Sequence, residues 1–293
     1  MTEALRGHLA MLCFSGLIAG SFALGSMAAP HVAPTALNAV RFVLASVLVG
    51  AVALGTTGIS RGALAAPWRY LLMGACMGIY FVLMFEGLKT APPVSASAVF
   101  TLTPVISGLF GYVLLRQVTT RRMALALAVG AAGALWVIFR ADMQALLAFQ
   151  VGRGEAIYFV GCVAHAFYTP LVRRLNRGEP PVVFSFGAMA GAALLIALAG
   201  WGDIRATDWT SLPAIVWITI AYTAVFATAA TFVLLQYASL RLPSAKVMAY
   251  TYLTPSWVIC WQAALGHGLP RGLLLVGVGL TVLALLMLLK DEH

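Results

Sequence analysis

The sequence is built mainly from apolar runs of about 20 residues, separated by short stretches that contain proline, glycine or charged residues. A helix needs about 20 mainly apolar residues to cross the hydrocarbon core of a bilayer. Of the 293 residues, 62% are hydrophobic and 9% are charged, whereas a soluble domain carries about 25% charged residues. This composition excludes a soluble globular enzyme and a disordered chain, and the continuous runs do not fit the alternating strands of an outer-membrane barrel. The expected class is an all-α integral membrane protein.

Ten of these runs are predicted to be transmembrane helices. No connection between them is long enough to fold as a soluble domain, so the chemistry is expected among the helices. The first run is longer than the apolar region of a signal peptide, and we expect it to be retained. The predicted limits are 8–28, 35–54, 68–88, 94–115, 122–139, 155–172, 182–200, 212–236, 245–265 and 273–289.

The basic residues predict an orientation. The net charge is +9, but the lysines and arginines lie in short connections and form no single water-exposed face, so nucleic acid is not an expected partner. If the N-terminus is cytoplasmic, twelve basic residues lie on that side and five on the other. Because cytoplasmic loops of membrane proteins are enriched in Lys and Arg, we expect both termini in the cytoplasm. The expected location is a bacterial-type cytoplasmic (inner) membrane, with lipid around a multi-pass chain.

Cysteine and histidine give no sign of catalytic or metal chemistry. The four cysteines lie inside apolar runs without CxxC spacing, and the five histidines are scattered. This pattern favours small buried hydrophobic residues over a metal site or a disulfide framework. We therefore expect no cofactor, no metal and no enzyme activity.

The two halves of the chain carry the same landmarks in the same order. A Leu-Thr-Pro triplet ends at Pro104 in the fourth predicted helix and at Pro255 in the ninth, and Phe81 matches Phe232 at the same offset of 151. A glycine and a proline bracket the first and sixth helices at an offset of 147. Five crossings per half is an odd number, so we predict two inverted five-helix repeats, residues 1–140 and 154–293. Such symmetry suits alternating access, although duplication without transport is the competing interpretation.

The two prolines are expected to kink their helices. Each proline removes one backbone donor and frees the carbonyl four residues earlier, which needs another partner inside a membrane. Pro104 and Pro255 are therefore candidate points where the helices line a substrate cavity. A kink that serves packing alone is the alternative interpretation.

The combination of ten spans, two opposed halves and the run LTPVISGLFGYVLL at residues 102–115 resembles the EamA-type members of the drug/metabolite transporter superfamily. Glycine-rich helices around Gly130, Gly133 and Gly277 are similar as well. Within that superfamily the chain looks most like YddG-type exporters of aromatic and other neutral amino acids. The resemblance implies a basket of helices around a central cavity, built mainly from helices one, three, four, six, eight and nine.

Two departures limit what the resemblance carries over. Members of the family often have Gly-Glu at the end of the fourth helix, where this chain has Arg116-Gln117. Smaller relatives couple protons through a glutamate in the first helix, and this chain has no acid in that helix after Glu3. Proton coupling is therefore not carried over.

Candidate substrate contacts come from aromatic and polar residues in the middle of the predicted spans. Aromatic belts at the membrane interface explain tryptophans near helix ends, but they do not explain tyrosines near the bilayer centre, whose hydroxyls need partners. A wet, aromatic-lined cavity would supply them, and ordinary helix packing is the alternative. The candidate substrate-binding residues are Tyr80, Met84, Phe100, Thr101, Tyr158, His165, Tyr168, Tyr222, Lys246, Tyr250 and Trp257.

Four charged or titratable residues among or beside these carry a specific expectation and an alternative. Arg41 and Glu86 are expected to pair or to line an outer vestibule; otherwise Arg41 snorkels and Glu86 caps its span. Lys246 is a candidate for the substrate carboxylate, or else an interfacial lysine. His165 is a candidate ligand contact or titrating group, or else bonds a neighbouring helix.

The function expected from these features is export of small metabolites, above all aromatic and neutral amino acids, by alternating access. The alternatives are efflux of drugs or other metabolites and, without a catalytic constellation to support it, a polytopic membrane enzyme. The expected partner is a small-molecule substrate, and the protein is expected to be a monomer or a homodimer.

Overall fold

The computed structural model describes residues 3–270 and 272–289, and within these ranges every regular element is a helix. Nine helices in this part of the chain are long and apolar enough to cross a membrane, and the protein is therefore a multi-pass membrane protein. They are α1 (Glu3–Ala28), α2 (Pro34–Thr56), α4 (Trp68–Gly87), α5 with α6 (Pro93–Leu115), α7 (Arg121–Ile138), α9 (Arg153–Leu175), α10 (Pro181–Ala199), α12 with α13 (Ala214–Ser239) and α16 (Gly272–Leu289).

The predicted span 245–265 is not one regular helix. Three pieces follow one another here: α14 (Ser244–Ala249), the 3-10 helix η2 (Tyr250–Leu253) and α15 (Thr254–Ala264). Three further short helices, α3 (Arg61–Leu64), α8 (Met143–Leu147) and α11 (Trp201–Ala206), lie in connections that were expected to be loops. Among the described residues, nine of the ten predicted spans thus correspond to helices long and apolar enough to cross a membrane, and the tenth, 245–265, is divided into three short helices.

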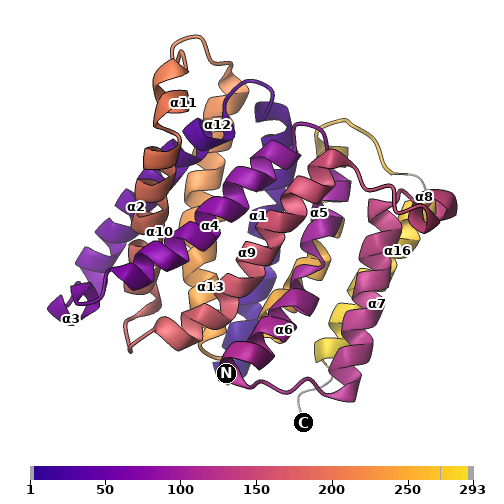
Figure 1. Cartoon of the computed structure of the whole chain (residues 1–293), viewed down its shortest axis with the longest axis horizontal. Coiled ribbons are helices and arrows are strands. Elements are labelled where there is room, and N and C mark those ends of the chain that lie inside the picture. Colours follow the sequence, from indigo (N-terminus) through magenta and orange to yellow (C-terminus); the bar gives the residue numbers. More distant parts are fainter. Residues whose placement is uncertain (1–2, 271, 290–293) are drawn as a thin grey trace.

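Figure 1 shows how the helices run between two ends of the molecule. The first turn of α1 and the last turn of α16 lie at the same end, which we call the terminal end. The short helices α8 and α11 lie at the opposite end, so α1 and α9 run in opposite directions. The part of the chain that connects α13 to α14 returns to the terminal end.

Helix contacts follow a paired pattern. The α4 helix packs on α9, and α1 packs on α13; α10 packs on α4, and α12 packs on α2. Likewise α6 contacts α9 while α15 contacts α1, and α5 contacts α7 while η2 contacts α16. In each pair, the first contact corresponds to the second when the helices before residue 140 are matched in chain order with those after residue 152.

The two Leu-Thr-Pro triplets mark helix breaks. The α5 helix (Pro93–Phe100) ends before α6 (Thr103–Leu115) begins, and Pro104 lies in the first turn of α6 as Pro255 lies in the first turn of α15. A first-turn proline removes an N–H that would have no intrahelical partner in any case. The expected kinks in continuous helices are therefore replaced by breaks, and these meet where Thr103 Oγ1 lies 3.3 Å from Thr251 Oγ1.

Small residues allow the close helix contacts. A Cβ added at Gly74 in α4 would lie 2.3 Å from the backbone nitrogen of Ala192 in α10. A Cβ at Gly133 in α7 would lie 2.6 Å from the carbonyl oxygen of Gly277 in α16. Helix association in lipid depends on such backbone approach, because lipid tails are as apolar as the side chains.

The charged side chains divide between the two ends. The last residue before the α6–α7 connection and the ends of α7 and α9 that lie at the terminal end carry basic residues: Arg116, Arg121, Arg122, Arg173 and Arg174. The segments at the opposite end, which include α8, α11 and the start of α9, carry both signs of charge: Asp142, Arg153, Glu155, Asp203 and Arg205. Two residues of the predicted count, Arg271 and Lys290, lie outside the described residues.

Candidate functional site

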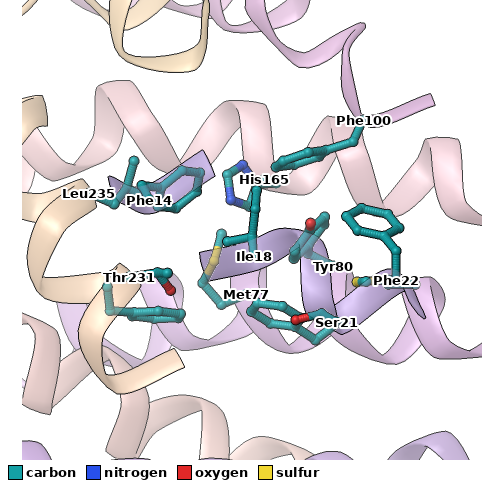
Figure 2. Close-up of a pocket in the computed structure, with 13 residues that line it drawn as sticks. Phe14, Ile18, Ser21, Phe22, Met77, Tyr80, Phe100, His165, Thr231 and Leu235 are labelled. Atoms are coloured by element: carbon teal, nitrogen blue, oxygen red, sulfur yellow. The ribbon is translucent and has the colours of Figure 1, made fainter. Parts of the chain in front are cut away.

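A small cavity lies at the centre of the bundle, between α1, α4, α5, α9 and α13 (Figure 2). Its volume is about 10 Å³, which is room for about one water molecule. The hydrated hollow that the sequence predicts is therefore closed in this conformation. The lining residues are Phe14, Ile18, Ser21, Phe22, Met77, Tyr80, Phe81, Met84, Phe100, His165, Thr231, Phe232 and Leu235.

The lining is a cage of aromatic rings around two polar groups. The His165 ring lies with its centroid 4.5 Å from that of Tyr80 and 5.1 Å from that of Phe100. Phe81 and Phe232, the pair related by the internal repeat, stack at 6.4 Å. Such ring pairs are worth about 0.5–1.5 kcal/mol each beyond the area they bury, so the cage is held in shape by its own contacts.

Two polar atoms in this cage lack a hydrogen-bond partner among the described residues: Ser21 Oγ and His165 Nδ1. Both residues are buried, and Figure 2 shows them among the rings of Phe14, Tyr80 and Phe100. Buried polar groups in proteins are nearly always hydrogen-bonded. In this conformation the two atoms therefore line a space that has room for about one water molecule.

Four of the eleven predicted substrate-binding residues line the cavity: Tyr80, Met84, Phe100 and His165. Two more support it from behind. The Tyr158 hydroxyl lies 2.9 Å from that of Tyr80, and the Tyr168 hydroxyl accepts a hydrogen bond of 2.7 Å from Gln236 Nε2. These contacts fix the rings that form the wall.

The other five predicted residues lie away from the cavity in this conformation. The Thr101 hydroxyl donates to Ala98 O, that of Tyr222 donates to Leu17 O, and that of Tyr250 lies 3.1 Å from His8 Nδ1. Trp257 is 40% exposed, and Lys246 is buried at the start of α14. Neither Pro104 nor Pro255 is among the described lining residues in this conformation.

The family resemblance placed the first helix around the central cavity, but the sequence interpretation named no residue of that helix as a substrate contact. Phe14, Ile18, Ser21 and Phe22 occupy one face of α1, at the spacing of successive helical turns. That spacing was available as a signal, but α1 is apolar on all sides, so periodicity alone does not distinguish the face that points inward. Phe232 was identified only as a repeat landmark.

Arg41 and Glu86 do not pair. Glu86 Oε2 accepts a salt bridge of 2.7 Å from Lys89 Nζ near the surface, whereas Arg41 is completely buried. The expected pairing and the expected snorkelling of Arg41 are both replaced by a buried position in the middle of the protein.

The Arg41 guanidinium is held by neutral groups. Nε donates to Thr228 Oγ1 at 2.6 Å, Nη2 donates to Ala227 O at 3.0 Å, and Nη1 lies 3.4 Å from Asn38 Oδ1. Thr228 and Ala227 belong to a π-helical turn, η1 (Val225–Ala230), within the predicted eighth span. Such turns occur often at functional sites, and no local sequence signal predicted this one.

The cavity lining is mainly aromatic and apolar. Within the described part of the chain, no cluster of three His, Cys, Asp or Glu side chains is placed to hold a metal ion. The lining offers rings, a thioether pair and hydroxyl and imidazole groups. This arrangement is suited to binding and enclosing a molecule.

Comparison with known proteins agrees with this reading. The model of the EamA-like transporter family matches residues 5–139 and again residues 152–290. An uncharacterized transporter of Bacillus subtilis (strain 168), YyaM, is 26% identical over 226 residues, which are 76% of this chain and 73% of that protein. A protein of known crystal structure superposes with a TM-score of 0.72 at 21% identity and covers 99% of both chains, which supports the fold alone. The two matches to the family model together span nearly the whole sequence, and the chain belongs to the EamA-like transporter family of the drug/metabolite transporter superfamily.

Proposed function

We propose that this protein exports small metabolites, chiefly aromatic and other neutral amino acids, by alternating access through the central cavity. The observation that carries the proposal is the pair of unpartnered polar atoms, Ser21 Oγ and His165 Nδ1, inside a closed aromatic cage. An amino acid has the matching chemistry, because its side chain fits the rings and its charged groups need hydrogen bonds.

Alternating access requires two halves that can exchange shapes. We propose ten crossings, in which α14, η2 and α15 together form the ninth, and two inverted repeats within residues 1–140 and 154–293. The paired helix contacts, the two matches to the family model and the opposite directions of α1 and α9 support this symmetry. The closed cavity then corresponds to an occluded intermediate between an inward-open and an outward-open form.

The proposed location is the cytoplasmic membrane of a bacterium, with the terminal end in the cytoplasm. The excess of basic residues at that end supports this orientation, because Lys and Arg accumulate on cytoplasmic faces. Export then runs from the terminal end toward the end that carries α8 and α11.

Counterflow in proteoliposomes tests the function. Vesicles that contain the purified full chain and unlabelled phenylalanine are expected to accumulate labelled phenylalanine, tryptophan and leucine, but not lysine or glutamate. Ser21→Ala and His165→Leu are each expected to lower the exchange rate about fivefold, since each removes a polar contact to the substrate.

Two matched controls separate binding from folding. Ser26 lies on the same helix as Ser21, but its hydroxyl already donates to Ala23 O at 2.9 Å; His31 is exposed in the connection between α1 and α2. Ser26→Ala and His31→Ala should leave exchange unchanged. Absence of exchange for every amino acid, with exchange of a lipophilic drug instead, would replace amino-acid export by drug efflux.

A further inference from the structure

We propose that Arg41 is the receptor for the carboxylate of the transported molecule, so that the substrate class is apolar or aromatic carboxylic acids, amino acids included. This inference rests on the proposed function and makes its substrate class specific. In the closed conformation Arg41 is buried, so the proposed contact with the carboxylate forms only when the cavity opens.

Arg41 has no counter-charge among the described residues. Arg41 is 0% exposed, and within the described residues no Asp or Glu forms an ion pair with it. Arg69, the other arginine that is almost wholly buried, is paired with Glu179 at 2.7 Å. A charge buried without a partner of opposite sign is costly. Arg69 has such a partner, whereas Arg41 has none among the described residues.

The Arg41 guanidinium has more N–H donors than hydrogen bonds to the described residues. A guanidinium carries five N–H groups, and Arg41 makes three hydrogen bonds to the described residues, to Thr228, Ala227 and Asn38. The contact to Asn38 is long, at 3.4 Å. Two N–H groups, one on Nη1 and one on Nη2, therefore stay available, and a pair of donors on adjacent nitrogens matches the two oxygens of a carboxylate.

The Arg41 guanidinium lies close to the central cavity. The Arg41 Cζ atom lies 3.9 Å from the centroid of the Phe81 ring, and Phe81 is a lining residue of the central cavity. Thr228 is one helical turn from Thr231, which also lines the cavity. The guanidinium thus lies one aromatic ring behind the cavity wall. On this proposal, the Phe81 ring moves aside when the cage opens and the guanidinium then faces the cavity.

Asn38 and the π-turn η1 connect the Arg41 guanidinium to its neighbours on two sides. Asn38 contacts Arg41 and donates to the carbonyl oxygen of Phe81 at 3.3 Å, so it links the cation to the backbone of the covering ring. The π-turn η1 holds the other side of the guanidinium through Ala227 and Thr228. Because a π-turn is a rare, single-turn feature within an α-helix, a shift of η1 toward α-helical bonding would withdraw Ala227 O and Thr228 Oγ1 and release the Arg41 N–H donors to the substrate carboxylate.

The ligand chemistry follows from these contacts. A carboxylate on Arg41 places the rest of the molecule among the rings of the cage, with Ser21 Oγ and His165 Nδ1 available to an ammonium or other polar group. No lysine or arginine is among the described lining residues. The single charge of Arg41 neutralises a monoanionic carboxylate, but it neutralises only half of the charge of a phosphate dianion.

The experiment compares ligands of one size that differ at the acid. Purified full-length protein in nanodiscs is titrated with phenylalanine, phenylalaninamide, phenylethylamine and 3-phenylpropionate, and binding is followed by tryptophan fluorescence. Phenylalanine and 3-phenylpropionate are expected to bind about thirtyfold or more tightly than the amide and the amine, because only the acids supply the missing counter-charge.

Variants then locate the effect. Arg41→Gln should bring the affinity for phenylalanine down to that for the amide while leaving the amide's affinity unchanged. Thr228→Val keeps the charge and should retain the preference for acids. Arg205→Gln, a matched change at an exposed arginine near the other end, should have no effect.

The outcomes separate the two proposals. Equal binding of acid and amide by the unaltered protein, or an Arg41→Gln variant that still prefers the acid, overturns the assignment of Arg41. If that variant does not fold, the ligand series on the unaltered protein decides alone. Exchange of phenylalanine in proteoliposomes without preference for acids leaves the export function standing and removes only this inference; no binding and no exchange of any of the four ligands removes both.

Discussion

Arg69 Nη2 lies 2.7 Å from Glu179 Oε1, and the two side chains are 1% and 6% exposed. Arg69 is in the first turn of α4, and Glu179 is in the connection between α9 and α10. Arg69 Nη1 also donates to Leu175 O at 2.6 Å, and the backbone N–H of Arg177 donates to Glu179 Oε2 at 2.6 Å. The pair therefore joins the two halves of the chain near the terminal end.

This pair predicts acid-sensitive stability. Burial acts to raise the pKa of the Glu179 carboxyl, but hydrogen bonds from Arg69 and from the backbone of Arg177 lower it, and the net pKa lies below the ordinary value. Because the pKa is lower in the folded protein, the ionised carboxyl stabilises the fold above the unfolded pKa, and this stabilisation is lost as the pH falls through the folded pKa. The unfolding temperature in detergent should fall when the pH is lowered from about 5 to about 3.

A pair of variants isolates this contribution. Glu179→Gln should cost about 3 kcal/mol at neutral pH, because it leaves the buried Arg69 without its counter-charge, and it should flatten the acid dependence. Glu86→Gln breaks the Lys89–Glu86 pair, whose side chains are 36% and 39% exposed, and should cost less than about 1 kcal/mol. Equal effects of the two variants would contradict the prediction.

The contact between α7 and α16 predicts a contrast between two neighbouring glycines. A Cβ at Gly277 would lie 2.8 Å from the carbonyl oxygen of Gly133, whereas a Cβ at Gly279 meets nothing within 4 Å. Gly277→Ala should therefore destabilise the protein by about 1–3 kcal/mol. Gly279→Ala should be neutral or slightly stabilising, because alanine favours helix by about 0.5–1 kcal/mol. Thermal unfolding of both variants in the same detergent checks this, and a loss at Gly279 as large as at Gly277 would speak against close packing here.

The hydroxyl pair behind the cavity predicts non-additive effects. Tyr80 and Tyr158 lie with their oxygens 2.9 Å apart, and both are almost fully buried. Tyr80→Phe or Tyr158→Phe alone leaves the other hydroxyl without this partner and should cost about 1–2 kcal/mol. The double variant should cost less than the sum of the single variants, because it removes both polar groups at once. A strictly additive cycle in chemical unfolding would show that the two hydroxyls do not interact.

The proposed ninth crossing predicts a labelling pattern. Single cysteines are introduced at Val118, Phe149 and Leu269, which are 79%, 73% and 75% exposed, after alanine has replaced the four native cysteines. If α14, η2 and α15 together cross the membrane, an impermeant maleimide applied to intact spheroplasts should label Phe149→Cys and Leu269→Cys, and Val118→Cys should react only after permeabilisation. Labelling of Leu269→Cys together with Val118→Cys would place the two loops on one side and remove the ninth crossing.

The positions of the helices could be predicted because the signals are local. The runs predicted at 68–88 and 94–115 correspond to Trp68–Gly87 and Pro93–Leu115, since apolar length and the prolines at helix starts are read from neighbouring residues. The EamA family resemblance, confirmed by the family model, rests on similar local runs. The sequence did not predict the break between Phe100 and Thr103, nor the π-turn at Val225–Ala230, because these depend on contacts with other helices.

The membrane class, the approximate spans and the aromatic character of the centre follow from the sequence alone, because each is a property of composition and of short-range order. The tertiary structure decided which rings face one another, that Arg41 is buried on Phe81 and a π-turn while Glu86 remains near the surface with Lys89, and that the cavity is closed. In a helix that is apolar on every side, the sequence pattern does not show which face points inward. That choice is made only when the backbones approach and the few buried polar groups find, or fail to find, their partners.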